Sequence, residues 1–153
     1  MPSISVMGIS FPREIRYGLA SCLVGTVAMD IVLLLQYHLF GQPLTTSFIL
    51  YGSIIGGGTG EGLVLHLLFG AMLGLLFGAL ISRFDAFRID SMGKGLKVGV
   101  TAGLVTIPLG CVPFAAVAGV PLMIMIPFVF LPHLTWGLVM GGLTSHLLTT
   151  RDG

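Results

Sequence analysis

Two long stretches of the chain carry no formal charge, and they limit its possible folds more than any other feature. Residues 62–82 and 98–150 contain no Asp, Glu, Lys or Arg. A helix that crosses a bilayer needs roughly 20 apolar residues, so the first stretch holds one crossing. The second is long enough for two, and Gly119-Val120-Pro121 divides it. The apolar stretch 17–40, which only Asp30 interrupts, supplies a further crossing.

We therefore expect an all-α fold, a polytopic four-transmembrane-helix bundle that forms a single domain over residues 1–153. Apolar residues make up 55% of the chain and charged residues 8%, with a mean hydropathy of +1.04, as a chain in hydrocarbon requires. The segments do not alternate polar and apolar residues, as the strands of a membrane barrel would. The predicted helices span residues 17–40, 61–82, 95–118 and 125–149.

The basic residues predict the orientation of these helices. They precede the first helix, flank the link between the second and third, or follow the fourth: Arg13, Arg16, Arg83, Arg88, Lys94, Lys97 and Arg151. By the positive-inside rule both termini are cytoplasmic and the protein is a multi-pass protein of the cell membrane. The net charge of +1 gives no sign of a nucleic-acid partner.

A repeated motif divides the chain into two similar halves. Residues 66–74 and 133–141 both read His-Leu-x-aromatic-Gly-x-x-x-Gly. The halves, roughly 17–83 and 94–150, are each predicted to form a helical hairpin that enters from the cytoplasm. An even number of crossings per half makes the hairpins parallel, related by an axis along the membrane normal.

Small residues recur every four positions in three of the predicted helices. They are Gly70, Gly74 and Gly78, then Gly95, Gly99 and Gly103, and finally Gly137, Gly141 and Ser145. Such stripes let membrane helices approach closely. They predict a tight bundle with little internal room, with two possible partners for each stripe: the equivalent stripe of the other hairpin, or the helix of its own hairpin.

Four ionisable residues fall in the outer half of the predicted membrane: Asp30, Glu61, His66 and His133. Two imidazoles and a carboxylate would suit a metal site for copper, zinc or iron. The two histidines could also be axial ligands of a b-type haem, although close helix packing disfavours it. Buried ionisable groups further suggest proton or ion movement. The simplest interpretation is that the histidines form hydrogen bonds between helices and Asp30 is protonated or paired.

The outer loop, about residues 41–60, has two interpretations. Its apolar part, 47–51, is followed by the glycine-rich run 56–60. The loop could be a re-entrant segment that contacts a substrate. We favour a loop that rests on the bilayer through aromatic anchors. Phe69 and Trp136 occupy the aromatic position of the repeat, and we expect both to be core residues.

The pattern resembles a family of small, uncharacterised four-helix membrane proteins found in archaea and bacteria. The similarity rests on Gly25-Thr26-Val27-Ala28-Met29, on His66 with Gly70 and Gly74, and on His133 with Trp136-Gly137 and Gly141. It covers most of residues 17–149. The resemblance implies the four-helix fold and no particular activity. Asp30 departs from it, since a neutral polar residue is expected there.

No catalytic motif stands out, so an enzyme acting by itself is not the expectation. The leading hypothesis is a non-catalytic integral membrane subunit of a larger complex, such as a respiratory or copper monooxygenase assembly. The alternative is a redox or transport component that binds a metal or haem at the outer site. A third hypothesis is a protein that moves protons or ions through Asp30.

Overall fold

The computed structural model describes residues 5–6, 9–112, 115–116, 119 and 121–150. Its helices are α1 (Arg13–Leu39), α2 (Thr46–Ile54), α3 (Thr59–Arg83), the 3-10 helix η1 (Asp85–Phe87), α4 (Met92–Thr106), the π-helix η2 (Ile107–Cys111) and α6 (Leu122–Thr149). Two short strands, β1 (Ser5–Val6) and β2 (Ile9–Ser10), pair antiparallel before α1. The predicted helical fold is confirmed.

Three helices are long and apolar enough to cross a membrane among the residues that the structure describes. They are α1, α3 and the part Met125–Thr149 of α6. The prediction of a fourth continuous crossing over 95–118 is wrong. Helix α4 has 15 residues, about 22 Å at 1.5 Å per residue, which is short of the roughly 30 Å hydrocarbon core.

Proline explains why α4 stops being a regular helix. Pro108 lies in η2, where it has no N–H to donate and its ring crowds the preceding turn. A wider π turn accommodates such a break locally. The segment therefore continues as the π-helix to Cys111, and residues 113–114, 117–118 and 120 of the predicted crossing and its loop lie outside the described part of the chain.

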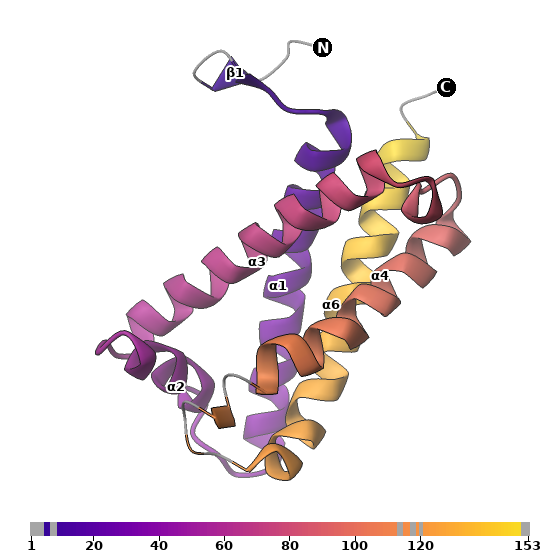
Figure 1. Ribbon diagram of the computed structural model, residues 1–153. Coiled ribbons are helices and arrows are strands. Elements are labelled where there is room, and N and C mark those ends of the chain that lie inside the picture. Colours follow the sequence, from indigo (N-terminus) through magenta and orange to yellow (C-terminus); the bar gives the residue numbers. More distant parts are fainter. Residues whose placement is uncertain (1–4, 7–8, 113–114, 117–118, 120, 151–153) are drawn as a thin grey trace.

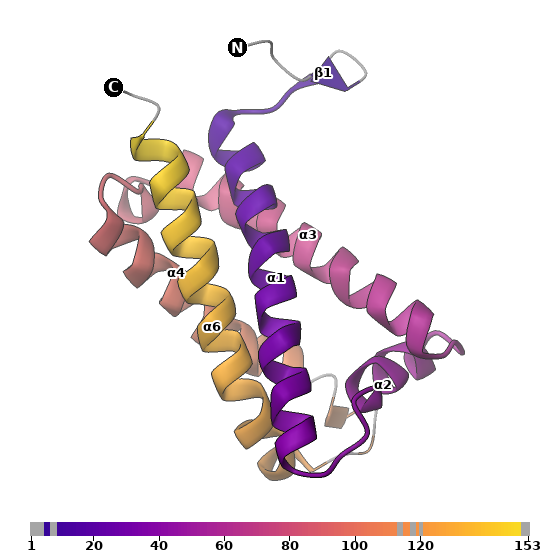
Figure 2. The same ribbon diagram turned by 180° about the vertical axis from the view of Figure 1, so that it is seen from behind.

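The helices lie in the order α3, α1, α6, α4 (Figures 1 and 2). Helices α1 and α3 form the first hairpin and α4 and α6 the second, as the repeat predicted, and α1 joins them by packing on α6. No comparable packing joins α3 to α4 among the described residues. A twofold axis would make the α3–α4 contact equal to the α1–α6 contact, so the predicted symmetry does not extend to the whole bundle.

The glycine stripes are used within each hairpin. In the second hairpin, a Cβ on Gly99 would meet the backbone of Gly137 and, at 2.7 Å, that of Gly141. In the first, a Cβ on Gly74 would meet Cys22 Cβ at 2.7 Å and the Leu19 Cα at 2.9 Å. The stripes of α3 and α6 therefore face their own hairpin partners and not each other.

One end of the molecule carries the basic residues. The start of α1, the end of α6 and the link from α3 to α4 lie together there, at the top of Figure 1. Arg13 opens α1, Arg83 closes α3 and Lys94 lies in the first turn of α4. We call this the basic end, and we call the opposite end, which the sequence predicts to face outward, the outer end. Arg151 lies outside the described residues.

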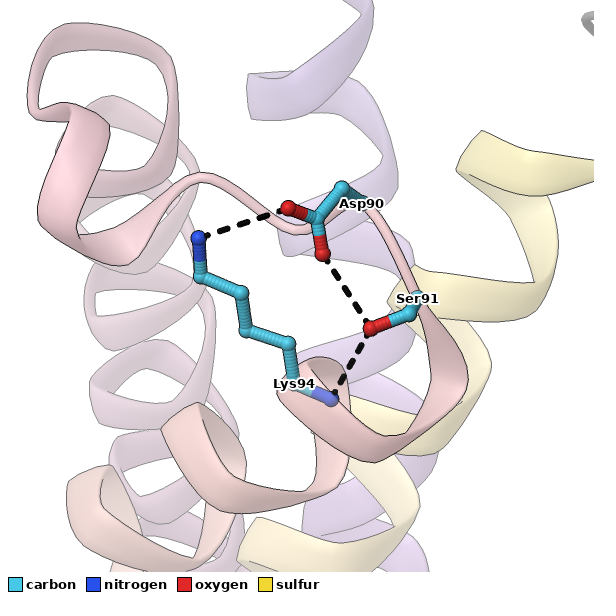
Figure 3. A network of polar contacts seen from close by, with 3 residues as sticks. All are labelled: Asp90, Ser91 and Lys94. Carbon is cyan, nitrogen blue, oxygen red and sulfur yellow. Dashed lines mark hydrogen bonds and ion pairs between the residues drawn. The ribbon is translucent and has the colours of Figure 1, made fainter.

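A polar network starts the second hairpin at the basic end (Figure 3). The Ser91 side chain caps α4 by accepting a hydrogen bond from the Lys94 backbone N–H at 3.4 Å, and its hydroxyl donates to Asp90 Oδ1 at 3.1 Å. The Lys94 ammonium lies 3.6 Å from Asp90 Oδ2. The Ser91 hydroxyl, with a smaller contribution from Lys94, holds the pKa of Asp90 below its ordinary value.

Candidate functional site

A buried pair of ionisable side chains joins α1 to α3. Nδ1 of His66 lies 2.9 Å from Oδ1 of Asp30. Asp30 is 8% exposed and His66 6% exposed, so neither group is solvated. The two atoms lack the alignment of a hydrogen bond with each other or with another described residue, so the contact is chiefly electrostatic. Because an unpaired acid within a membrane helix is costly, His66 explains how Asp30 is tolerated there.

The pair lies toward the outer end of the hairpin. His66 is the eighth residue of α3, which begins at Thr59, about 10 Å along the helix axis. Asp30 lies in the second half of α1. Both residues therefore lie in the parts of their helices that are nearer the outer end, and their depth in a membrane stays a prediction.

Helix α2 covers the outer side of the pair. It lies so close to α3 that a Cβ on Gly62 would overlap the carbonyl oxygen of Phe48. This approach stacks the Tyr51 ring on the His66 imidazole, with centroids 5.0 Å apart and planes at 23°. The Phe48 ring lies 6.2 Å from the same imidazole. The favoured interpretation of this loop, with its aromatic side chains as bilayer anchors, is therefore wrong for Phe48 and Tyr51.

A cavity of about 390 Å³ lies beside the buried pair, between α3 and η2. Its walls include His66 from α3, Met29 from α1, Trp136 from α6 and Leu109 from η2. The lining is mainly apolar, and the volume falls in the range of small-molecule sites. We call it the outer cavity. The expectation of little internal room is wrong, because α3 and α4 do not pack closely on each other among the described residues.

His133 lines the same cavity from α6. Its Nδ1 lies 2.7 Å from the carbonyl oxygen of Val129, one turn earlier in its own helix. A carbonyl only accepts, so Nδ1 carries the hydrogen. No described carboxylate lies within ion-pair distance of this imidazole. A lone charge in hydrocarbon is costly, so His133 is neutral and its Nε2 is an acceptor.

Glu61 takes no part in this site. Its side chain is exposed, and its Oε2 accepts a hydrogen bond from the Gly58 N–H at 2.9 Å in the capping box that starts α3. Of the four predicted metal ligands, Asp30 and His66 are paired, and His133 lines the same cavity as His66. No three His, Cys, Asp or Glu side chains form a group that could hold a metal ion in the described part of the chain.

The haem hypothesis rested on His66 and His133 lying on helices that might face each other. Their helices, α3 and α6, are separated by α1. Moreover, the glycines below each histidine pack against α1 and α4 respectively. Close packing of α3 on α6, which would disfavour haem, is therefore not found among the described residues. The histidines share a cavity without forming a helix-to-helix contact.

Several residues that line the cavity were not predicted from the sequence. Tyr51 comes from a segment that was expected to be a loop, and Leu109 from a turn that follows the irregular end of α4. Phe69 was expected in the core but is 44% exposed and borders the cavity, whereas Trp136 is 4% exposed as predicted. The apolar run 47–51 was the one sequence signal for α2 as part of the site.

Comparison with known proteins adds no relative: no family model, no curated protein and no solved structure matches the chain. The resemblance to small four-helix membrane proteins thus stays a prediction. The geometry of the site is the only basis for a functional proposal.

Proposed function

We propose that this chain is a non-catalytic integral membrane protein that binds a small ligand in the outer cavity. The observation that carries the proposal is the buried pair of Asp30 and His66, of which His66 lines a mainly apolar cavity. Ligand sites typically combine an apolar lining with a few polar groups that orient the ligand. Ionisable residues inside a membrane are functional candidates by default.

Several features support binding over a purely structural role for the pair. A hydrogen bond between two helices needs no cavity beside it. Here α2 lies over His66 through an aromatic stack and two further walls come from η2 and α6. Six elements, α1, α2, α3, α4, η2 and α6, thus line this one space, which is more than the joining of α1 to α3 requires.

The test is to purify the full chain in mild detergent and analyse what remains bound. Organic extraction with mass spectrometry would identify small molecules, and elemental analysis of the same sample would find copper, zinc or iron. We expect a bound species that is lost in the double variant Asp30→Leu/His66→Leu, which removes both members of the pair together. A folded wild-type protein with no retained species, or equal retention by the variant, would contradict the proposal.

A second candidate function, proton movement, is favoured by buried hydroxyls nearer the basic end. Ser21, Thr144 and Ser145 are fully buried, and their hydroxyl oxygens have no hydrogen-bond partner among the described residues. We infer that these unpaired hydroxyls are candidates for a proton path that includes Asp30. This candidate predicts proton flux in proteoliposomes that disappears in Asp30→Asn. Wild-type vesicles that leak protons no faster than empty ones would exclude it.

Membership of a larger membrane complex stays a prediction. The glycine stripes give no support to it, because they are occupied within the two hairpins. Native electrophoresis after mild extraction would settle the point. A stable lone monomer or homodimer would count against a complex and would leave the ligand-binding proposal intact.

A further inference from the structure

The outer cavity opens sideways, between α3 and η2, toward the region where lipid would lie. Four of its lining residues have strongly exposed side chains: Phe69 at 44%, Met72 at 55%, Leu109 at 70% and Ile54 at 43%. They come from α3, η2 and α2, and no extensive packing between α3 and η2 is found in the described part of the chain. An apolar molecule can therefore reach the cavity from the bilayer without crossing water.

The Asp30–His66 pair presents a hydrogen-bond donor to the cavity. A net charge in hydrocarbon is strongly disfavoured, and the 2.9 Å approach of Asp30 Oδ1 to His66 Nδ1 fits a carboxylate beside an imidazolium, which together are neutral. An imidazolium carries a hydrogen on both ring nitrogens, Nε2 included. Since Nδ1 faces Asp30, the Nε2 edge is left for the cavity.

His133 presents the complementary group. Its Nδ1 hydrogen is donated to Val129, so Nε2 of the neutral ring has a lone pair and accepts. The outer cavity thus offers one donor, from His66, and one acceptor, from His133, within an apolar lining. A head group that matches must itself accept one hydrogen bond and donate another.

We propose that the outer cavity binds a single-chain amphiphile from the bilayer whose head group is a hydroxyl or a protonated carboxyl. The head group accepts from His66 and donates to His133, and the apolar chain leaves between Phe69 and Leu109 into the lipid. This inference rests on the proposed ligand-binding function and names the class of its ligand. No covalent step is involved.

The single tryptophan of the chain makes the proposal measurable. Trp136 is the only Trp in the sequence and lines the outer cavity, so a brominated alkyl chain bound there quenches its fluorescence. The probes are a dibrominated C18 alcohol, the matching acid, its methyl ester and the matching alkane. They are titrated into the full chain in phosphatidylcholine nanodiscs. The alcohol and acid supply both hydrogen bonds, the ester only an acceptor, and the alkane neither.

We expect the alcohol and the protonated acid to quench at concentrations at least about tenfold lower than the ester, because a buried hydrogen bond left unmade costs roughly 1–3 kcal/mol. The alkane should be weaker still. The variant His133→Phe should bind the alcohol and the ester equally, since it removes the hydrogen-bond acceptor. The variant His66→Phe should weaken the binding of every probe whose head group accepts a hydrogen bond. If a variant only lost packing, its binding of the alkane would be weakened as much as its binding of the alcohol.

Two outcomes would overturn the inference. One is equal quenching by alcohol, ester and alkane, which would mean that lipid chains enter without recognition. The other is an alcohol preference that survives His133→Phe. Neither result would contradict binding of a metal or another small ligand in the extraction experiment. Conversely, the purified protein could retain no bound species and still bind the alcohol selectively in nanodiscs. That result would support the inference although the extraction experiment had failed. The two proposals can therefore fail separately.

Discussion

The two hairpins share a pattern of glycines and differ in what lies beside the histidine. Gly18 of the first hairpin corresponds to Gly95 of the second, 77 positions later. With the same offset, Asp30 corresponds to Ile107. In the first hairpin His66 is paired with Asp30 on the neighbouring helix. In the second, His133 has an apolar residue at the equivalent position and bonds its own helix.

This difference separates what the repeat maintains from what it allows to vary. Backbone-to-backbone contact needs glycine where the helices cross, because a Cβ there would overlap the backbone of the neighbouring helix. The residue that faces the histidine is not under that constraint. The asymmetry therefore gives one cavity a donor from the first hairpin and an acceptor from the second, which two identical hairpins would not supply.

The largest expected effect comes from breaking the glycine contact of the second hairpin. A Cβ on Gly141 would meet the Gly99 Cα at 2.9 Å and overlap the Gly95 carbonyl oxygen, and backbone atoms cannot rotate away. We expect Gly141→Leu to lower the free energy of unfolding by about 3 kcal/mol or more, measured by thermal denaturation in detergent. Gly93→Leu is the matched control, since nothing lies within 4 Å of its Cβ. Equal melting temperatures would show that the hairpin contact is not close.

The next effect distinguishes the two histidines. We expect the single changes Asp30→Leu and His66→Leu each to cost about 2–3 kcal/mol, and a double-mutant cycle to give a coupling of about 1–3 kcal/mol, as for residues in direct contact. His133→Leu should cost less than about 1 kcal/mol, because its hydrogen bond is local to one helix turn. A coupling near zero for Asp30 and His66 would contradict the pairing and with it the contrast between the hairpins.

A smaller effect tests whether the first hairpin is as tightly constrained as the second. A Cβ on Gly70 would meet only side-chain atoms of Thr26. Gly70→Ala should therefore cost about 1–2 kcal/mol, and Thr26→Ala in the same chain should recover much of it. A Cβ on Gly99 would meet the backbone of Gly137, so no second substitution can relieve the clash in Gly99→Ala. Failure of Thr26→Ala to restore the melting temperature would show that α1 and α3 approach through backbone here too.

The smallest effect concerns how each hairpin begins. Helix α1 follows Pro12 with no side-chain cap, whereas Ser91 caps α4. Because the Ser91 bond is long, we expect Ser91→Ala to cost about 0.5 kcal/mol, the low end for a cap, and to raise the pKa of Asp90 toward its ordinary value.

The pH dependence of this cap has a definite sign. Since folding lowers the pKa of Asp90, its contribution to stability is present above the unfolded pKa and is lost as the pH falls through the folded pKa. An NMR titration of the Asp90 carboxyl carbon in wild type and Ser91→Ala measures the shift. Identical curves would show that the Ser91 hydroxyl does not hold the carboxylate.

The helices were predictable because hydrocarbon imposes a simple rule on composition. The predicted segment 17–40 became Arg13–Leu39 and 61–82 became Thr59–Arg83. The break at Pro108 was missed, because the whole segment is apolar and length alone was counted. Helix α2 was missed because its nine residues are too few to give a periodic signal and come shortly after a glycine and a proline.

The candidate site was predictable only in part. Asp30, His66 and His133 were identified because ionisable residues are rare in apolar helices. Glu61 was included for its depth alone, and the structure places it as a cap at the exposed start of α3. Tyr51 could not be assigned to His66, since only the approach of α2 to α3 brings the two rings together.

The sequence by itself determined that the chain is helical and apolar, that it consists of two similar hairpins, and which residues are ionisable within them. These properties depend on composition and spacing along one dimension. The tertiary structure decided which helix each glycine stripe packs against and left a cavity between α3 and η2. It also decided that His66 pairs with Asp30, whereas His133 donates a hydrogen bond to the backbone of its own helix. Those are choices between partners that lie far apart in sequence, and packing in three dimensions selects among them.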